Sequence, residues 1–502
     1  MSRRAARDAG LTPGDVTPGA VPGAQPGTTT VTEESTEKTG IAAVIARHPR
    51  AWLAGALGLA FVLLGTGAVF AGAAVGSTSS VVAETPADQA PPEDPARVVP
   101  DAIPAATGLR TCSIADLTDD ERLGRLRAYV VNASTGEALY SLGGTKTASP
   151  ASVAQLITAT SAIKVLGPDY TIATKVYRTS EEGTIVLVGG GDPTISNTDP
   201  GTQSFYTDAP KLSTLADLTN GALAGVPVTK IILDSSYWSE ADSWDETWKR
   251  SEQTKGYLSE VTALQVDGDR SDPTKSQSPR TDDPVKHAGE LFAAKLGFPD
   301  AALEVGTVAE GSEEIATVSS QPVSALVNTM LLTSDQTLAE TLARVTSKVA
   351  GADGSAASLQ GVFAGSLTEL GLDVDGVVVR DGSGQSTENQ ATPRFMTDLV
   401  TKIHEGGDNL NYVYNSLPVA GKTGTLADRF TGANEVAVDK VIAKTGWISS
   451  ERSLAGIIEA EDGTTLAFAF YGLKDGIESS AKAALDSLAT GVYKCGENLA
   501  GE

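Results

Sequence analysis

The sequence predicts an α/β fold whose main sheet contains strands from both ends of one folded unit. The unit opens with a hairpin pattern at residues 125–133 and 137–143, and it closes with strand-like segments at 439–449, 452–461 and 464–472. Helical patterns occupy the centre of the unit and its last segment. We therefore expect strands from the two ends to join one sheet, with helices covering it.

Composition places the chain among large globular proteins and excludes some classes of function. Its 502 residues are 41% hydrophobic, which is enough for a large core. The formal net charge is −25, so the chain lacks the basic face that a nucleic-acid binder needs, and we expect no nucleic-acid partner. The chain has three histidines, which argues against a histidine-rich metal site.

The N-terminal region contains a candidate membrane span. Residues 1–50 are rich in Gly, Pro, Thr and Ala without periodicity, which predicts a disordered tail. Residues 51–76 carry no charge, and about 20 apolar residues are enough to cross a bilayer core. Arg47 and Arg50 precede this run, so the positive-inside rule predicts a single-pass protein of the cell membrane, with a cytoplasmic tail and an extracytoplasmic main domain. The alternative is a cleaved signal peptide, which ordinarily has a shorter apolar run.

A stalk and a folded domain follow the span. Residues 77–108 are rich in Pro, Ala and acidic side chains and predict an extended stalk, so we expect the folded domain at 109–500. Cys112 and Cys495 bracket this domain. Thiols outside the membrane tend to oxidise, so the placement favours a disulfide that ties the two ends together over two unrelated free thiols.

Further elements are expected between the hairpin and the closing strands. Pro150 begins a helical pattern that ends before Gly167. Later patterns predict strands at 171–178, 183–191 and 228–236, paired helices over 321–351 and a terminal helix over 479–495.

Short motifs occur in a fixed order between residues 110 and 495. They are Pro150-Ala151-Ser152, Gly189-Gly190-Gly191-Asp192-Pro193, Asp234-Ser235-Ser236, Ser334-Asp335-Gln336, Asp381-Gly382-Ser383-Gly384, Gly424-Thr425-Leu426 with Arg429-Phe430, and Ala443-Lys444-Thr445-Gly446. Together they resemble the D-alanyl-D-alanine carboxypeptidase/endopeptidase family of low-molecular-mass penicillin-binding proteins. The resemblance implies a serine β-lactamase/penicillin-binding-protein-like fold with an antiparallel sheet flanked by helices. It also implies peptidoglycan stem peptides and β-lactams as ligands, and no cofactor or metal.

The distance between two motifs along the chain predicts an insert. Ser152 and Ser334 are separated by far more residues than a compact core of this type needs. We expect an inserted subdomain of mixed strands at about 175–320.

The resemblance implies acyl transfer through a serine. Ser152 is the nucleophile near a helix start, where free backbone N–H groups favour developing negative charge. Ser334 relays protons, and Lys444 and Thr445 hold the terminal carboxylate of the stem peptide. The backbone N–H of Trp447, next to Gly446, completes the oxyanion hole with that of Ser152. A second Lys-Thr-Gly begins at Lys422, but its context matches the segment that precedes the carboxylate-binding strand.

Three residues depart from the family pattern at the active-site motifs. Gln155 stands where the family has the lysine that takes the serine proton, and an amide is not a base at neutral pH. Gln336 stands where asparagine is usual, and Trp447 where a small hydroxyl residue is usual. General-base catalysis contributes about 10²–10⁴ in rate, so we expect an impaired or inactive member. Lys164 lies too far along the helix to replace the base. Lys146, just before the helix, stays a candidate for that role.

Two classes of function therefore compete. One is a serine D-Ala-D-Ala carboxypeptidase or endopeptidase that trims peptidoglycan stems. The other is a membrane-tethered, non-catalytic module that binds stem peptides or scaffolds wall enzymes. A β-lactamase or esterase is a weaker reading, because the long insert argues against it.

Overall fold

The computed structural model describes residues 109–501. The predicted tail at 1–50, span at 51–76 and stalk at 77–108 all lie outside the described residues. Among the residues that are described, no helix is long and apolar enough to cross a bilayer.

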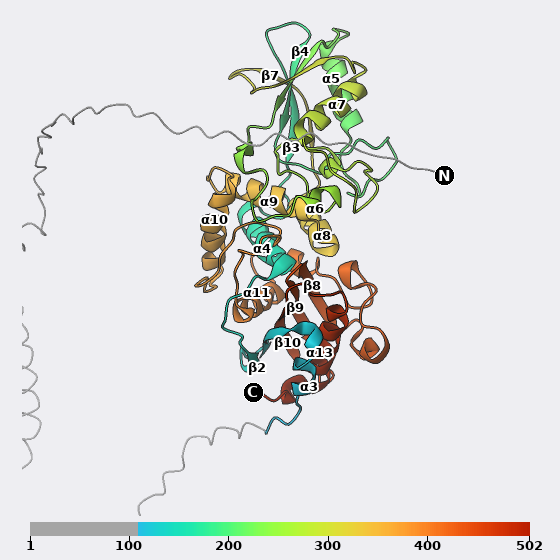
Figure 1. The fold of residues 1–502 in the computed structure, drawn as a ribbon. Helices are drawn as coiled ribbons and strands as arrows, with labels where there is room; N and C mark the ends of the chain where they lie inside the picture. The colour runs from blue at the N-terminus through green and yellow to red at the C-terminus, as the bar shows by residue number, and fades with distance from the viewer. Residues whose placement is uncertain (1–108, 502) are drawn as a thin grey trace, which may run out of the picture. The chain divides into compact units, whose positions relative to one another are not determined.

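The main sheet joins both ends of the domain, as predicted (Figure 1). Its five antiparallel strands have the order β2-β1-β10-β9-β8. Their bounds are β1 Arg125–Asn132, β2 Ala138–Leu142, β8 Val441–Ile448, β9 Glu451–Glu459 and β10 Thr465–Leu473. β1 pairs with β10 over its whole length, from Arg125 opposite Leu473 to Asn132 opposite Leu466. The first and the last strand of the domain therefore form the centre of one sheet.

Both faces of this sheet are buried, which explains the almost unbroken apolar run of β10. Along β10, Ala467, Ala469 and Tyr471 belong to one hydrophobic core. The alternating residues Phe468 and Phe470 belong to a second core. Successive side chains of a strand point to opposite faces, so each face needs its own apolar set.

Helices cover the two faces and fill the middle of the domain (Figure 1). The long ones are α4 Gln155–Leu166, α8 Val323–Thr333, α9 Gln336–Val349, α10 Ala356–Glu369, α11 Pro393–Glu405 and α13 Ala481–Cys495. Short helices are α3 Ala115–Thr118, α6 Ser251–Thr254 and α12 Asn411–Tyr414. α11 packs on β10 and β1, whereas α13 packs on β9, so the sheet lies between two helical layers.

A second, mixed sheet forms the insert. Its order is β6-β5-β4-β3-β7, with β4, β5 and β6 parallel and β3 antiparallel to both β4 and β7. The strands are β3 Ala173–Arg178, β4 Thr184–Gly189, β5 Lys230–Asp234, β6 Ala302–Val305 and β7 Glu313–Ser319, and the helices α5 Leu212–Leu223 and α7 Pro284–Leu296 accompany them. This unit has its own core, around Leu187, Ile231 and Phe292.

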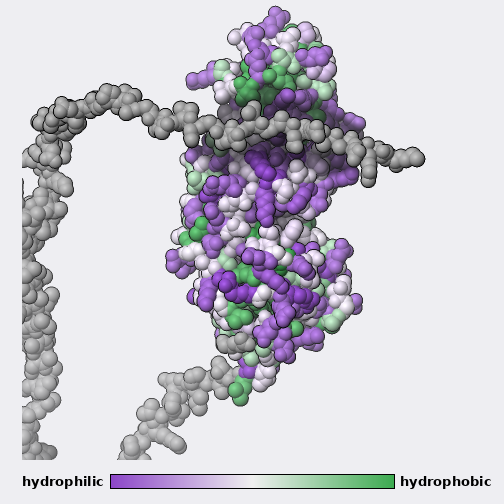
Figure 2. Space-filling view, viewed as in Figure 1, coloured by the Kyte–Doolittle hydropathy of each residue, from purple (hydrophilic) through white to green (hydrophobic). Residues whose placement is uncertain are grey.

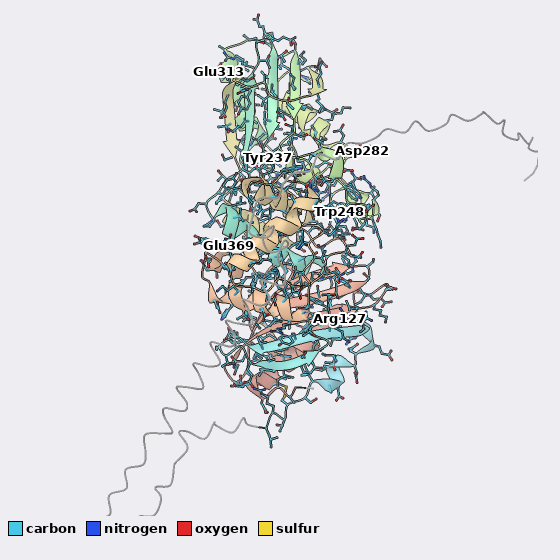
Figure 3. The ribbon with its side chains drawn as sticks, turned by 90° about the vertical axis from the view of Figure 1, so that its left-hand side faces the viewer. Arg127, Tyr237, Trp248, Asp282, Glu313 and Glu369 are labelled. Atoms are coloured by element: carbon cyan, nitrogen blue, oxygen red, sulfur yellow. A yellow bond between two sulfur atoms is a disulfide. The ribbon has the colours of Figure 1, made fainter. Side chains whose placement is uncertain are left out.

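The insert reaches back to the central helices through a long segment between β5 and α7. In the side view, Glu313 lies at the far end of the insert, Arg127 lies on the main sheet, and Trp248 lies between them (Figure 3). Trp248 is buried, and its indole N–H donates a 2.8 Å hydrogen bond to Asp381. The insert therefore contacts the loop that begins at Asp381.

Cys112 and Cys495 form a disulfide that closes the domain, with their Cα atoms 5.4 Å apart. The backbone supports the same closure, because Cys112 N–H donates to the carbonyl of Asn498 and Ala500 N–H donates to the carbonyl of Cys112. Hydrophilic residues dominate the face of the domain in the space-filling view, as expected of a domain in contact with water (Figure 2).

Candidate active site

Ser152 lies in a tight turn before a central helix. The turn is a 3-10 segment, Ala151–Ala154, and the α-helix α4 starts only at Gln155. The structure thus divides the helical pattern that begins at Pro150. Ser152 is buried except for 5% of its surface, and it faces a pocket. The turn is tied to the main sheet because Ser453 Oγ, on β9, donates a 2.6 Å hydrogen bond to the Pro150 carbonyl.

Two glycines allow the backbone to approach the Ser152 turn closely. A Cβ atom at Gly446, on β8, would collide with Ser453 Oγ and lie 2.8 Å from the Pro150 carbonyl oxygen. Gly384 has a φ of +80°, and a Cβ atom there would collide with the carbonyl of Ala151. The turn is therefore held between β8 and the loop that follows Asp381.

Lys444 and Ser334 meet beside the pocket. Lys444, on β8, is fully buried, and its ammonium donates 2.8 Å hydrogen bonds to Ser334 Oγ and to the carbonyl of Thr445. Burial lowers the pKa of Lys444 to about 7. Ser334 lies between α8 and α9 in the left-handed region, with a φ of +58°, and Asp335 caps α9 by accepting from Leu338 N–H.

In the described chain, Gln155 bonds a neighbouring loop and not Ser152. Its side chain is fully buried, and its amide donates a 3.3 Å hydrogen bond to the carbonyl of Ser383. Its Oε1 atom has no hydrogen-bond partner among the described residues, and no hydrogen bond joins it to the Ser152 hydroxyl there. On the same helix, Thr158 donates a 2.6 Å hydrogen bond to the carbonyl of Gly382.

The loop that accepts these bonds is fixed by two buried carboxyl groups. Glu340, on α9, accepts hydrogen bonds from the backbone N–H groups of Gly382 and Ser383. Asp381 accepts from Gly384 N–H at 2.8 Å. Burial and the neighbouring Asp381 raise the pKa of Glu340. The two carboxyl groups thus hold the loop in place beside the Ser152 turn.

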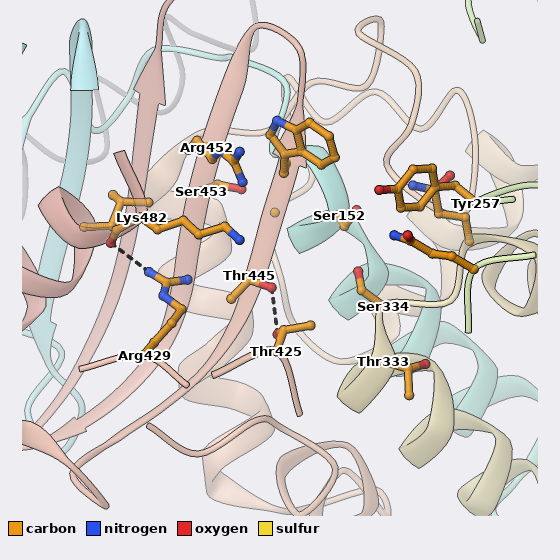
Figure 4. Close-up of a pocket in the computed structure, with 15 residues that line it drawn as sticks. Ser152, Tyr257, Thr333, Ser334, Thr425, Arg429, Thr445, Arg452, Ser453 and Lys482 are labelled. Carbon is orange, nitrogen blue, oxygen red and sulfur yellow. Dashed lines mark hydrogen bonds between the residues drawn. The ribbon is translucent and has the colours of Figure 1, made fainter. Parts of the chain in front are cut away.

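A pocket of about 310 Å³ gathers most of the predicted site residues (Figure 4). Six of them line it: Ser152, Ser334, Gln336, Thr445, Gly446 and Trp447. Gln155 and Lys444 lie behind this lining, within hydrogen-bond distance of Ser383 and Ser334 respectively. The pocket therefore joins α4, the α8–α9 junction and β8.

Sequence reasoning did not assign several other residues that line the pocket. They are Tyr257, Gln277, Thr333, Thr425, Arg429, Arg452, Ser453, Lys482 and Leu485. Thr425 and Arg429 lie within the recognised motifs, and Thr425 Oγ1 is 2.8 Å from Thr445 Oγ1. Arg452 begins the Arg-Ser-Leu-Ala-Gly segment that follows the Lys444 strand, and Lys482 lies in the terminal helix; neither side chain had been given a role.

Trp447 shapes the open side of the pocket. Trp447 is 44% exposed, and its ring meets that of Tyr257 edge to face, with 6.4 Å between the ring centroids. The guanidinium carbon of Arg452 lies 4.7 Å from the centroid of the Trp447 ring. The indole therefore occupies the place where a small hydroxyl residue would leave space.

The other lysines considered as bases or carboxylate ligands lie elsewhere. Lys146 is exposed and does not line the pocket, and Lys164 pairs with Asp408 at 3.0 Å. Lys422 pairs with Asp439 at 3.1 Å on the surface. Of the two Lys-Thr-Gly sequences, the one at Lys444 thus lies on the strand beside Ser334.

Comparison with known proteins agrees with this geometry. The model of the D-Ala-D-Ala carboxypeptidase 3 (S13) family matches residues 111–278 and 270–492. The chain belongs to this carboxypeptidase family. The carboxypeptidase DacB of Mycolicibacterium smegmatis is 32% identical over 455 residues, which cover 88% of this chain and 97% of that protein. The carboxypeptidase Rv3627c of Mycobacterium tuberculosis is 30% identical over 416 residues, covering 81% and 89% of the two chains.

Solved structures show the same fold as this S13 family member. Penicillin-binding protein 4 (DacB) of Haemophilus influenzae is 19% identical, with a TM-score of 0.62 over 76% of this chain and 98% of that one. The same protein in complex with a β-lactam is similar, with 18% identity, a TM-score of 0.58 and the same coverage. The predicted family and fold class are therefore confirmed.

Proposed function

We propose that this chain is a membrane-anchored penicillin-binding protein of the serine D-Ala-D-Ala carboxypeptidase/endopeptidase class, and that Gln155 impairs its acylation step. It binds peptidoglycan stem peptides and β-lactams in the pocket at Ser152. The observation that carries the impairment is the amide side chain of Gln155 at the position of the base, because it leaves the serine without a base on its own helix, and this amide donates to the Ser383 carbonyl.

The reaction needs a proton acceptor at one defined step. Ser152 Oγ bonds to the carbonyl carbon of the penultimate residue, and its hydroxyl proton passes to a base. The backbone N–H groups of Ser152 and Trp447 stabilise the oxyanion. The C–N bond to the terminal residue then breaks, the leaving amine takes up a proton, and water hydrolyses the acyl ester. Gln155 cannot hold the proton in the first step, because an amide is not basic near neutral pH.

The amine of Lys444 supports slow rather than absent chemistry. A pKa of about 7 leaves a substantial neutral fraction at physiological pH, and Ser334 connects this amine with the pocket. The relay is indirect, because the hydrogen bonds of Lys444 in the described chain reach Ser334 and the Thr445 carbonyl and not Ser152. We therefore expect acylation that is slow but dependent on Ser152.

Ligand binding needs no base, and the pocket retains its groups for it. Thr445 and Thr425 present two hydroxyls, 2.8 Å apart, at the edge of β8. That the H. influenzae neighbour was solved in complex with a β-lactam supports β-lactams as ligands here. The second candidate function, a stem-peptide-binding or scaffold protein without turnover, is favoured by the same amide at Gln155, which supplies no base.

The decisive experiment incubates the full-length protein in detergent with a fluorescent penicillin. We expect slow covalent labelling of wild type and none of Ser152→Ala, with the label on the peptide that contains Ser152. Absence of labelling with retained non-covalent binding of a stem peptide would assign the non-catalytic role. Absence of both labelling and binding would overturn the proposal.

The proposed location is tested separately. The uncharged run at 51–76 supports a single span with the domain outside. The protein should then remain with membranes in high salt, require detergent for release, and be digested by protease added to intact spheroplasts. Recovery in the soluble fraction would contradict the anchor.

A further inference from the structure

Two cations of the pocket have no carboxylate partner in the described chain. Arg452 is 7% exposed, and its Nε atom lacks a hydrogen-bond partner among the described residues. Lys482 is exposed at the pocket rim and forms no ion pair with any described residue. Arg429, in contrast, donates to Asp486 at 2.6 Å. Buried charges are normally paired, so the unpaired Arg452 requires an explanation.

The basic side chains of Arg429, Arg452 and Lys482 also repel one another. The pKa of Arg452 is lowered to about 10, first by burial and then by Arg429. The pKa of Lys482 is lowered by burial, then by Arg452 and Arg429, while Asp486 opposes the shift. Acidic residues outnumber basic ones 63 to 38 in the whole chain. A cluster of basic side chains without enough acidic partners is therefore unusual for this protein. An anion bound here would offset the free-energy cost of burying Arg452 and the repulsion among the three cations.

The position of Arg452 suits the end of a ligand that reacts at Ser152. Arg452 pairs directly with Trp447 in the β8–β9 ladder, and the Trp447 ring stacks against its guanidinium. Arg452 and Lys482 lie on the same side of the pocket as Thr445, while Ser152 and Ser334 lie on the other side (Figure 4). An extended peptide bound across the pocket would place its end at Thr445.

Lys444 is poorly placed to neutralise that end. Its side chain is fully buried, and its ammonium already donates to Ser334 and to the Thr445 carbonyl. The side chain of Trp447 carries no hydroxyl that could donate a hydrogen bond to the carboxylate. The unpaired groups next to Thr445 are therefore Arg452 and Lys482.

We propose that Arg452 and Lys482 form the anion subsite of the pocket and, with Thr445, receive the free C-terminal carboxylate of a bound peptide. This inference rests on the proposed function, and it assigns the recognition of the carboxylate to residues outside the Lys444-Thr445-Gly446 motif. Arg452 supplies a planar donor set held by Trp447, and Lys482 supplies a mobile charge at the rim. The subsite selects peptides that end in a carboxylate over peptides that end in an amide.

Calorimetry on the full-length protein tests this selectivity. The two probes are diacetyl-L-Lys-D-Ala-D-Ala and its C-terminal amide. We expect wild type to bind the acid at least about tenfold more tightly, as expected for charge-assisted hydrogen bonds. Arg452→Gln and Lys482→Gln should reduce that ratio, chiefly by weakening binding of the acid. The matched control Lys422→Gln, at a surface lysine paired with Asp439, should keep it.

The outcomes separate this inference from the proposed function. An unchanged acid-to-amide ratio in both variants overturns the subsite, while peptide binding still supports the proposed function. If neither peptide binds wild type, the proposed function fails, and acetate is used as the probe instead. A rise in Tm with acetate in wild type that disappears in Lys482→Gln then upholds the subsite, and no rise overturns it. Lys482 is exposed, so its variant remains informative should Arg452→Gln misfold.

Discussion

Gln155 donates its side-chain amide to the carbonyl of Ser383, which lies 228 residues further along the chain. The contact fixes the start of α4 against the loop that supports the Ser152 turn. The side chain at the base position therefore bonds this loop, and no hydrogen bond joins it to Ser152 in the described chain. One hydrogen bond thus stabilises the site, and the side chain that donates it is an amide, which cannot accept the serine proton.

Restoring a lysine at this position should restore acylation. In Gln155→Lys the introduced amine would lie one helical turn from Ser152, on the same face of the helix. We expect the rate of labelling by a fluorescent penicillin to rise by about 10²–10⁴, the usual contribution of a general base. The control is Gln155→Met, which has a similar volume and no base. Equal rates for the lysine and methionine variants would show that Gln336, Trp447 or the shape of the pocket limits the reaction.

The buried amine of Lys444 should make stability depend on pH. Its pKa is about 7 in the folded protein, lowered by burial from 10.5. Between these values the unfolded chain binds a proton that the folded chain does not, so the free energy of unfolding rises with pH. The slope from this group is at most about 1.4 kcal/mol per pH unit.

Urea unfolding of wild type and Lys444→Met from pH 6.5 to 9.5 measures this contribution as a difference. The free energy of unfolding of wild type, minus that of Lys444→Met, should increase as the pH rises through 7. Lys422→Met serves as the surface control and should follow wild type. Parallel pH profiles for wild type and Lys444→Met would mean that the lysine stays protonated in the fold.

Gly446 should tolerate no side chain. A Cβ atom there would collide with Ser453 Oγ, which itself holds the Pro150 carbonyl. We expect Gly446→Ala to lose about 1–3 kcal/mol of stability through overpacking, and to weaken ligand binding because the Ser152 turn must move. Gly361→Ala is the matched control, because it lies in α10 with open space around its Cβ position, and it should gain up to about 1 kcal/mol. Similar Tm changes for the two variants would refute the close approach of β8.

The disulfide between Cys112 and Cys495 should contribute measurably to folding. It closes a loop with a sequence separation of 383 residues, which restricts the unfolded chain. Cys112→Ser with Cys495→Ser should lower the free energy of unfolding by about 2–5 kcal/mol in denaturant titrations. Wild type with a reductant should lose the same amount. If reduction leaves the unfolding midpoint unchanged, the bond has no part in stability.

The sequence predicted the elements that have strong periodicity or clear boundaries. The hairpin of the main sheet, its three closing strands, the helix after Ser152 and the paired helices over 321–351 all lie close to their expected positions. Strands β6 and β7 were missed for a physical reason: they lie at the sheet edges of the insert, where most of their side chains contact solvent and the apolar alternation is weak. Nor were helices α5, α7, α10 and α11 singled out.

Motifs predicted which residues gather at the site, but not how they bond. Ser152, Ser334 and Thr445, which belong to three of the ordered motifs, line one pocket. The partner of Gln155 depends on a loop far along the chain, and the role of Arg452 depends on the register of β8 against β9. Both are tertiary relationships between residues whose local sequence carries no trace of the contact.

The closure of the domain at Cys112 and Cys495 has a mechanical consequence. A pull on the chain at the N-terminal end of the described part enters at Cys112, only 13 residues before β1 begins at Arg125. The disulfide transmits that force directly to α13. The force therefore does not separate β1 from β10 one residue pair after another. The pocket on β8 lies beyond the loaded connection and should keep its shape under tension that would otherwise unzip the centre of the sheet.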